Sequence, residues 1–425
     1  MSEFGSIIDE LRQFRQNMMD VSIPIVERIE EFTAFQHAVE AKALGTDNPF
    51  YYGLPLGSAP RGRVPIRDQQ LLNFASYDYL GLSDHPKLRQ AATEALDRFG
   101  VGPGGVRPLS GTTELHVELE AALTEWKGGE DAITFSSGFT ANLAVLTTLF
   151  GPEDHIILDH HAHASIVDGA RYSGAQLHVF RHNQPDKLEK VLQYVDKRRE
   201  KGRVLVAVDA VYSMDGDLAP LRELVELTQK FGAQLFIDEA HALGVLGPQG
   251  QGLAAHLGVD TPIDYQVGTL SKAIPGAGGF LIASRKTINF MRMLARPYSF
   301  SGALPAASCA TALAAIEVMQ TEPQHQARMW KLYELWKDGL QALGFDTMQT
   351  KTPIVPVLIK SFEETVVFNS YLFEAGLFVS PIFFPTVPLG SSRLRTCVTA
   401  SHIDEDVHEA LEIMAEVGGK MGLIG

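Results

Sequence analysis

The sequence predicts an α/β protein with a large domain, built on a mostly parallel β-sheet covered by helices, and a smaller C-terminal α+β domain. Short β-rich runs alternate with helical segments between residues 131 and 241, which is typical of a doubly covered parallel sheet. The pattern changes after residue 300. A length of 425 residues also suggests two or more domains. We predict an N-terminal segment over residues 1–72, a large domain over 73–300 and a small domain over 301–425.

The N-terminal segment is predicted to be mostly helical. Between residues 6 and 44, apolar residues recur at helical spacing: Ile7, Ile8, Leu11, Phe14 and Met18. Pro24 divides this region into two helices, which we expect to dock on the body or on a partner subunit rather than on a membrane. Residues 48–67 are rich in Gly, Pro and Tyr and are interpreted as a connecting loop.

The large domain opens at residues 71–83 and continues with a helix over 85–100 that ends at a glycine. Gly100, Gly102 and Gly105 match the dinucleotide pattern GxGxxG, but that pattern must follow a strand and this one follows a helix. We interpret it as a loop before a helix that starts at Thr113. Strands are predicted at 131–136, 155–159, 175–180, 204–213 and 233–241, with helices between them at 141–149, 164–174, 185–200 and 218–232.

The small domain is predicted from a mixture of helices and strands. An apolar helix over 304–319 and a charged helix over 324–343 come first. A strand at 354–360, a helix at 363–376, a strand-like segment at 393–401 and a final helix from Asp404 follow.

Composition excludes several classes of partner. The net charge is −15, and the chain has no basic stripe that could neutralise phosphates, so we expect no nucleic-acid partner. Two cysteines, Cys309 and Cys397, make neither a disulfide framework nor a zinc knuckle. A reducing, cytoplasmic setting fits this count, and the N-terminus is too charged for a signal peptide. The uncharged stretch at 132–152 has a polar centre, so we predict no transmembrane segment.

A single lysine, Lys272, stands out in the segment at 264–284. It follows Thr269 and precedes three glycines, between two short apolar runs. Most such lysines are solvated loop residues. The alternative is a lysine that forms a Schiff base with an aldehyde cofactor. That role requires a carboxylate for the cofactor's ring nitrogen, a group that stacks on the ring and a cradle for a phosphate.

Candidates for the first two requirements lie at predicted strand ends. Asp238 ends the strand at 233–241, where a carboxylate facing a pyridinium would keep that nitrogen protonated, and His241 follows three residues later. The letters DEAH also name a helicase motif, but the chain has no GxxxxGK[ST] loop. His160, His161 and His163 follow the strand at 155–159, where Asp159 completes a set that a metallohydrolase could use. The simpler interpretation is that one of the histidines stacks on an aromatic ring, and we assign no metal ligands.

The phosphate cradle is predicted at SSGFTAN, residues 136–142. There the backbone amides of Gly138 and Phe139, with Ser137 before them, begin a helix and could bind an anion. An ordinary strand-to-helix turn is the alternative. Polar residues that follow strands should gather at one edge of a parallel sheet, where ligands bind: Ser136, Ser137, Asp159, Ser213, Asp238 and Lys272.

Several motifs occur together in one order: SYDYLG, LSGTTELH, SSGFTAN, DHHAHAS, YSMDGDLAPL, DEAHALGVLG, TLSKA, FSGALP and RLRTCVTASH. In these motifs the chain resembles, from about Asn73 to His402, the α-oxoamine synthases, a branch of the fold-type-I pyridoxal-phosphate enzymes that includes serine palmitoyltransferase and 8-amino-7-oxononanoate synthase. SYDYLG replaces the SNDYLG of several members, which leans toward serine palmitoyltransferase. The SGT at 110–112 leans toward other members.

The resemblance implies roles around pyridoxal phosphate (PLP). Lys272 matches the lysine bonded to the cofactor, Asp238 the aspartate on its ring nitrogen and His163 the histidine stacked on its ring. His241 and Ser213 match groups near its phenolic oxygen.

The resemblance also implies a phosphate site and a partner subunit. Thr269, together with Ser137 and the amides of Gly138 and Phe139, matches the phosphate site. Ser301 resembles a residue that reaches the phosphate of a neighbouring subunit, which implies a homodimer with shared active sites.

Substrate binding is implied at the C-terminal motif. Arg395 resembles the arginine that binds the substrate carboxylate, with Arg393 as the second choice and Tyr77 nearby. The implied reaction is a decarboxylating Claisen condensation of a small amino acid with an acyl thioester, carried on CoA or on an acyl-carrier protein, that gives an α-amino ketone. The alternatives are another fold-type-I PLP enzyme, an aminotransferase or lyase, and, more remotely, the metallohydrolase.

Overall fold

The computed structural model describes residues 24, 26–30, 33 and 53–425. Residues 26–30 and 33 are helical, and the rest of the predicted N-terminal helices, apart from Pro24, lies outside the described residues.

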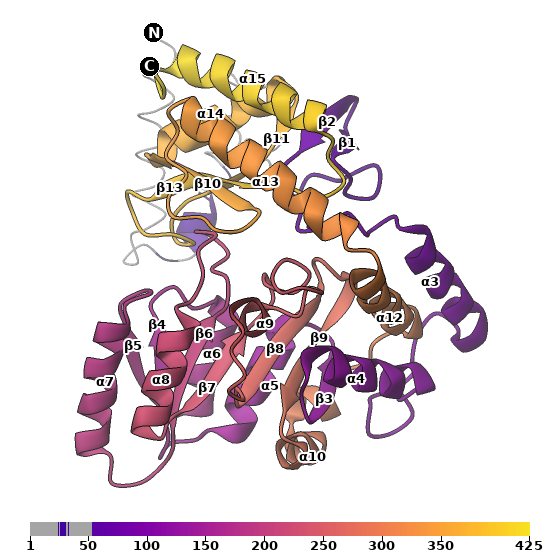
Figure 1. The fold of residues 1–425 in the computed structure, drawn as a ribbon, viewed down its shortest axis with the longest axis vertical. Coiled ribbons are helices and arrows are strands. Elements are labelled where there is room, and N and C mark those ends of the chain that lie inside the picture. The colour runs from indigo at the N-terminus through magenta and orange to yellow at the C-terminus, as the bar shows by residue number, and fades with distance from the viewer. Residues whose placement is uncertain (1–23, 25, 31–32, 34–52) are drawn as a thin grey trace.

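A seven-stranded sheet forms the centre of the larger part, in the order β3-β9-β8-β7-β6-β4-β5 (Figure 1). Only β9 runs antiparallel to its neighbours, β3 and β8. The other neighbouring pairs are parallel, so the predicted α/β fold with a mostly parallel sheet is confirmed. The strands are β3 (Asp131–Phe135), β4 (His155–Asp159), β5 (Gln176–Phe180), β6 (Val204–Asp209), β7 (Gln234–Asp238), β8 (Tyr265–Ser271) and β9 (Pro275–Ala283).

Helices cover both faces of this sheet because alternate side chains of its apolar strands point to opposite sides. In β6, Val206 belongs to one buried cluster and Leu205 to the other. The first cluster includes residues of α4 (Glu114–Lys127), α7 (Pro185–Arg198), α8 (Leu221–Phe231) and α12 (Ala306–Thr321). The second includes residues of α5 (Gly138–Leu149), α6 (Ala164–Ser173), α10 (Arg285–Leu294) and α11 (Arg296–Ser299).

The smaller part contains two three-stranded sheets and three long helices. One sheet has the order β10-β13-β12 and the other β1-β2-β11. Figure 1 shows both beside α14 and α15, above the seven-stranded sheet. The elements are β1 (Arg63–Ile66), β2 (Gln69–Asn73), β10 (Ile354–Lys360), β11 (Leu377–Phe378), β12 (Ser380–Ile382), β13 (Ser392–Cys397), α13 (Gln324–Ala342), α14 (Phe362–Glu374) and α15 (Asp404–Met421).

The predicted loop over residues 48–67 is wrong at its end, where β1 pairs antiparallel with β2. Pro65 lies within β1, and a proline in a strand argues against a central position. β1 is one of the two edge strands of its sheet, so the missing N–H of Pro65 is tolerated there.

The predicted domain bounds, 72/73 and 300/301, stay predictions, and the chain packs across both of these positions. Helix α12 follows residue 300 but packs on α4 and on α3 (Pro86–Phe99) of the larger part. Leu72 and Phe74 belong to the core of the smaller part, beside Trp336 of α13. The smaller part therefore combines residues from both sides of the larger one.

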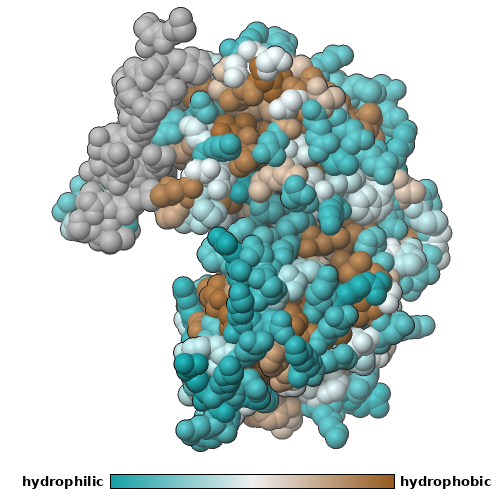
Figure 2. Space-filling model, turned by 60° about the vertical axis from the view of Figure 1, so that its left-hand side comes forward, coloured by the Kyte–Doolittle hydropathy of each residue, from teal (hydrophilic) through white to brown (hydrophobic). Residues whose placement is uncertain are grey.

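The uncharged stretch over 132–152 folds as β3 and α5, as predicted. Across the described segments, 24–33 with its gaps and 53–425, no helix is long and apolar enough to cross a membrane. The face drawn in Figure 2 is mostly hydrophilic, with apolar patches on both parts of the molecule.

Candidate active site

Charged residues gather where the parallel strands end. Asp159, Asp209 and Asp238 are the last residues of β4, β6 and β7, and Lys272 follows the end of β8. Asp209 and Asp238 are direct partners in the register of β6 and β7. The structure thus brings Lys272 and Asp238 to one edge of the sheet, where ligands of α/β proteins bind.

Lys272 lies in the tight connection between β8 and β9. Its Nζ is 2.8 Å from Nε2 of His241. Burial lowers the pKa of the Lys272 amine from 10.5 to about 8, although Asp238 opposes this shift and Arg395 adds to it. At pH 7 such a pKa leaves roughly one amine in eleven neutral, against about one in three thousand for an ordinary lysine. Lys272 is therefore prepared to act as a nucleophile and a base.

His241 connects Lys272 to a buried arginine. The Tyr79 hydroxyl lies 2.7 Å from His241 Nδ1, and Arg395 Nη2 donates to the same hydroxyl over 3.5 Å. Burial, and then the charges of Lys272 and Arg395, hold the pKa of His241 well below its usual range. The neutral ring carries one N–H, so it donates toward only one of its two neighbours and accepts from the other.

Asp238 is held in place by hydrogen bonds to both of its oxygens. Asn142 Nδ2 donates to Oδ2 over 2.6 Å, and the backbone N–H of Ala240 donates to Oδ1 over 2.9 Å. Asn142 also donates to Ser165 Oγ over 2.8 Å, and that hydroxyl lies 2.7 Å from His163 Nδ1. One network therefore orients both the Asp238 carboxylate and the His163 imidazole. His163 is an exposed residue, so its ring can receive a stacked group.

Asp209 adds a second carboxyl group beside Asp238. It accepts the backbone N–H of His163 over 3.0 Å. Burial, and then the charge of Asp238, raises the pKa of Asp209 well above its usual range. A protonated Asp209 avoids a second buried negative charge next to Asp238.

The predicted anion cradle lies at the N-terminus of α5 (Gly138–Leu149). Ser137 caps the helix and accepts the N–H of Thr140 over 3.0 Å. Two glycines allow the helix to approach the sheet. A Cβ on Gly138 would lie 3.1 Å from the Thr269 side chain, and one on Gly279 would lie 2.4 Å from the Ser137 carbonyl. The first amides of α5, at Gly138 and Phe139, thus begin a helix beside β8, and such a terminus binds anions.

Ser301 lies near the same turn of its own chain. Its Oγ donates to Ser136 Oγ over 3.4 Å. Its role toward a neighbouring subunit stays a prediction.

The two predicted arginines of β13 face the same side of the strand, toward residues 213–215. Arg395 is fully buried, and its Nε donates to the Ser213 carbonyl over 2.5 Å. Arg393 donates to the Met214 carbonyl over 3.0 Å and pairs with Asp215 over 2.6 Å. Arg393 is thus held in a structural ion pair, which leaves Arg395 as the better candidate for a substrate carboxylate.

Tyr77 lies over both cations of the site. Its ring centroid is 4.4 Å from Cζ of Arg395 and 5.9 Å from Nζ of Lys272. Its side chain is 41% exposed. Tyr77 therefore lies beside both the amine and the guanidinium.

The three histidines of DHHAHAS do not converge on one point. His163 contacts Ser165, whereas His161 stacks on His182 with ring centroids 4.0 Å apart. His182 bridges Asp159 and Asp217, 2.9 Å from each. The two carboxylates, against the effect of burial, raise the pKa of His182 to about 10. The imidazolium therefore serves to join β4 to the loop after β6.

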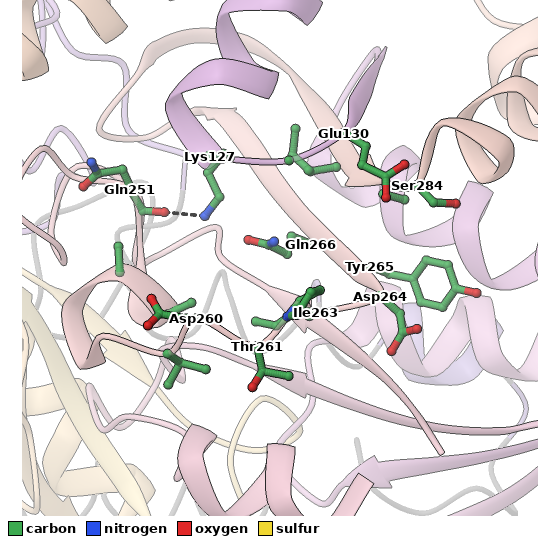
Figure 3. A pocket seen from close by; sticks show the side chains of 18 of the residues that line it. Lys127, Glu130, Gln251, Asp260, Thr261, Ile263, Asp264, Tyr265, Gln266 and Ser284 are labelled. Atoms are coloured by element: carbon green, nitrogen blue, oxygen red, sulfur yellow. Dashed lines mark hydrogen bonds between the residues drawn. The ribbon is translucent and has the colours of Figure 1, made fainter. Parts of the chain in front are cut away.

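Another well-buried lysine, Lys127, lies away from this edge. Its side chain is 3% exposed, and its Nζ lies 3.6 Å from Glu239 Oε1. Figure 3 shows Lys127 pointing to the Gln251 carbonyl in a cavity of about 630 Å³ that is lined by Tyr265 and Gln266, at the start of β8. Lys127 therefore has structural partners, and of these two buried lysines it is Lys272 that joins the charged cluster at the strand ends.

Sequence reasoning missed the residues that hold the site together: Tyr79, Asn142, Ser165 and Asp209. Two signals were available. Asn142 lies one helical turn after Gly138, which places both on one side of α5. Asp209 ends a buried strand in the same way as Asp238.

The comparisons with known proteins show the family of the chain. Residues 69–414 match the family described as aminotransferase class I and II. An 8-amino-7-oxononanoate synthase of Symbiobacterium thermophilum is 43% identical over 369 residues, which are 87% of this chain and 94% of that protein. One of Thermoanaerobacter pseudethanolicus is 42% identical over 376 residues, 88% of this chain and 94% of that protein.

A solved structure is similar to this chain in fold. A serine palmitoyltransferase of S. paucimobilis, with a bound PLP–myriocin adduct, is 32% identical and superposes with a TM-score of 0.89 over 95% of this chain and 100% of that one. The chain belongs to the aminotransferase class I and II family and, within it, to the α-oxoamine synthases. It is a PLP-dependent acyltransferase. The metallohydrolase alternative is wrong.

The residues of the site fit PLP. A lysine with a lowered pKa suits its aldehyde, the fixed Asp238 carboxylate suits its ring nitrogen, and the helix N-terminus suits its phosphate. When bound, PLP supplies an electron sink for the carbanion formed at the α-carbon of an amino acid.

Proposed function

We propose that this chain joins a small amino acid to an acyl thioester, with loss of CO₂, and that Lys272, Asp238, His163, His241 and Arg395 form its active site. The observation that carries this assignment is that the lowered-pKa amine of Lys272 and the fully buried guanidinium of Arg395 are linked through His241 and Tyr79. The base, Lys272, and the carboxylate-binding cation, Arg395, can thus act on the same amino-acid substrate. Thr269, Ser137 and the amides of Gly138 and Phe139 form the proposed phosphate site, with Ser213 near the cofactor.

Arg395 can hold the substrate carboxylate because part of its guanidinium remains available. A guanidinium has five N–H donors. Within residues 53–425, the described contacts of Arg395 use Nε once, for the Ser213 carbonyl, Nη1 once, for Cys397 Sγ, and Nη2 once, for Tyr79. One N–H therefore remains on each terminal nitrogen, the pair that makes a bidentate fork to a carboxylate.

Lys272 moves the proton that begins the reaction. In its neutral form it can take the α-proton of an amino acid whose carboxylate Arg395 holds. Fixing the carboxylate also fixes which bond at the α-carbon is aligned for cleavage. Neutral His241 can accept from, or donate to, the lysine amine as its protonation changes.

We propose alanine and an acyl group of seven carbons as the first substrates to test. In 8-amino-7-oxononanoate, the new bond joins the C7 carbonyl to C8, which carries an amino group and the C9 methyl group, so the amino acid is alanine and the acyl part is a seven-carbon diacid. The relatives with this name are 43% and 42% identical to the chain. Tyr77 and the TM-score of 0.89 favour serine with a long acyl chain as the second candidate.

A substrate panel tests this function. We expect the enzyme loaded with PLP to release both CoA thiol and CO₂ with one amino acid among alanine, glycine and serine. Each is paired with heptanedioyl-CoA or palmitoyl-CoA, and with the same acyl groups on acyl-carrier protein. Alanine with the seven-carbon diacid should be fastest. Amino-group transfer to an oxo acid without thiol release would instead indicate an aminotransferase.

We also propose that the chain works as a homodimer. Two segments of the chain are joined by the β-bridge between Val106 and Gly302. Together they form, beside Ser301, an exposed apolar surface. Its large residues are Val101, Leu109 and Phe300, which are 85%, 83% and 79% exposed. Apolar groups this exposed indicate a contact with another chain, and a second copy would place its Ser301 at the shared site.

Mixing two inactive variants tests the shared site. Lys272→Ala subunits and Ser301→Trp subunits are each expected to be inactive. In a 1:1 mixture about half of the dimers are heterodimers with one intact site of two, so about a quarter of the wild-type rate should return. A mixture no more active than its parents would contradict shared sites, as would a fully active monomer in light scattering.

A further inference from the structure

A second group of possible ligands lies outside the active site, where three helix ends meet. His85 precedes α3, Glu322 follows α12 and His325 lies in the first turn of α13. One nitrogen or oxygen from each side chain lies within 4.8 Å of those of the other two. In the proposed reaction these three residues have no role.

Two of the separations within this cluster match those around a tetrahedral metal ion. His85 Nε2 lies 3.5 Å and His325 Nε2 lies 3.3 Å from the same oxygen, Glu322 Oε2. Direct charge-assisted hydrogen bonds between such groups are shorter, about 2.7–2.9 Å. Zn²⁺ binds histidine nitrogen and carboxylate oxygen at about 2.0–2.2 Å, which in a tetrahedron separates two ligand atoms by about 3.3–3.5 Å. These two separations therefore fit ligands around an ion as well as they fit the long hydrogen bond between His325 Nε2 and Glu322 Oε2.

We propose that His85, Glu322 and His325 bind one divalent transition-metal ion of the zinc type, with water as the fourth ligand. The ligand set of two imidazoles and one carboxylate suits Zn²⁺. The three side chains are 16%, 31% and 25% exposed, respectively, so an ion can reach them from solvent. Gln324 Nε2 donates to Glu322 Oε2 over 3.1 Å and can orient the carboxylate.

The position of the site suggests what a bound ion would do. Glu322 and His325 flank Pro323, in the connection from α12 of the larger part to α13 of the smaller part. His85 follows the segment that contains Tyr77 and Tyr79. The chain turns after this segment, where the Asp78 carboxylate accepts the backbone N–H groups of residues 82 and 83. A metal ion would therefore cross-link the two parts beside the segment that carries two residues of the active site.

Calorimetric titration of the PLP-loaded enzyme with Zn²⁺ tests the site. The protein is first treated with a chelator, dialysed and kept free of amino acids. We expect one ion to bind per chain, and His325→Asn or Glu322→Gln to weaken binding about tenfold or more. The unfolding temperature should rise with Zn²⁺ in the wild type and much less in these variants. His256→Asn, which changes an exposed histidine of α9 (Leu253–Leu257), should bind like the wild type.

Two results would overturn the proposal. One is the absence of stoichiometric Zn²⁺ binding at micromolar concentrations. The other is binding that neither His325→Asn nor Glu322→Gln weakens, which would place the ion elsewhere. Both readouts are independent of the condensation reaction, so the failure of the proposed function would leave this test intact.

Discussion

Replacement of Lys272 by alanine is expected to abolish condensation, with thiol release at least about a thousandfold slower than in the wild type. The substitution removes both the nucleophile for the cofactor aldehyde and the base for the α-proton. It should not unfold the protein, because Lys272 makes no ion pair among the described residues and its hydrogen bond is to neutral His241. Thiol release from the best substrate pair measures the effect.

The control for Lys272→Ala is Lys286→Ala, which removes an exposed lysine of α10. This variant should keep the wild-type rate and the visible absorbance of bound PLP. If Lys272→Ala retains more than about a tenth of the wild-type rate, another residue is the base and the proposed assignment is wrong.

Replacement of Arg395 by lysine is expected to weaken amino-acid binding more than tenfold, a loss of more than about 1.4 kcal/mol. A lysine keeps the charge but loses the fork that two parallel N–H donors make with a carboxylate. PLP binding should be kept because none of the described contacts of Arg395 involves the N-terminus of α5. A titration with the amino acid, followed by the absorbance of the cofactor, gives the affinity.

Arg393→Lys is the matched control, two residues away on the same face of β13. It should lower the thermal stability, because it disturbs the buried pair with Asp215, and leave amino-acid binding within a few-fold. The opposite pattern would reverse the two roles. If neither variant changes the affinity, the carboxylate binds elsewhere, and Tyr77 is the next residue to test.

The fold was predictable where apolar runs are short and clearly bounded. The strand predicted at 155–159 has the bounds of β4. The strand predicted at 204–213 ends at Asp209 instead, because residues 210–218 turn back to form the Val211–Leu218 bridge. The direction of β9 could not be predicted, since an apolar run has the same pattern in either direction.

The placement of α12 shows a second limit. Its apolar residues surround the helix, since the buried residues Cys309, Ala310 and Ala315 lie on three different sides of it. A helix without a polar face is buried somewhere, but its pattern does not say against which part. Sequence order suggested the small domain, whereas the helix packs with α3 and α4.

The positions of site residues could be predicted where those residues end a strand or begin a helix. Asp238 and Gly138 are examples. Tyr79 was missed because its role depends on contacts with residues 162 and 316 positions away along the chain. Local patterns do not encode such contacts. The motif that contains Tyr79 drew attention to Tyr77 alone.

The electrostatic influence of Arg395 on Lys272 makes the strength of the base depend on the state of the site. The positive charge of Arg395 is one of the causes of the lowered pKa of the lysine amine. On the proposed assignment, a substrate carboxylate bound to Arg395 offsets that charge, and the pKa of Lys272 rises toward its usual value. A smaller share of the amine would then be neutral in the filled site than in the empty one, although the amine would hold a proton more tightly once it has taken it. The empty site would thus favour the neutral amine, the form that removes a proton, and the filled site would favour retention of the proton taken from the substrate.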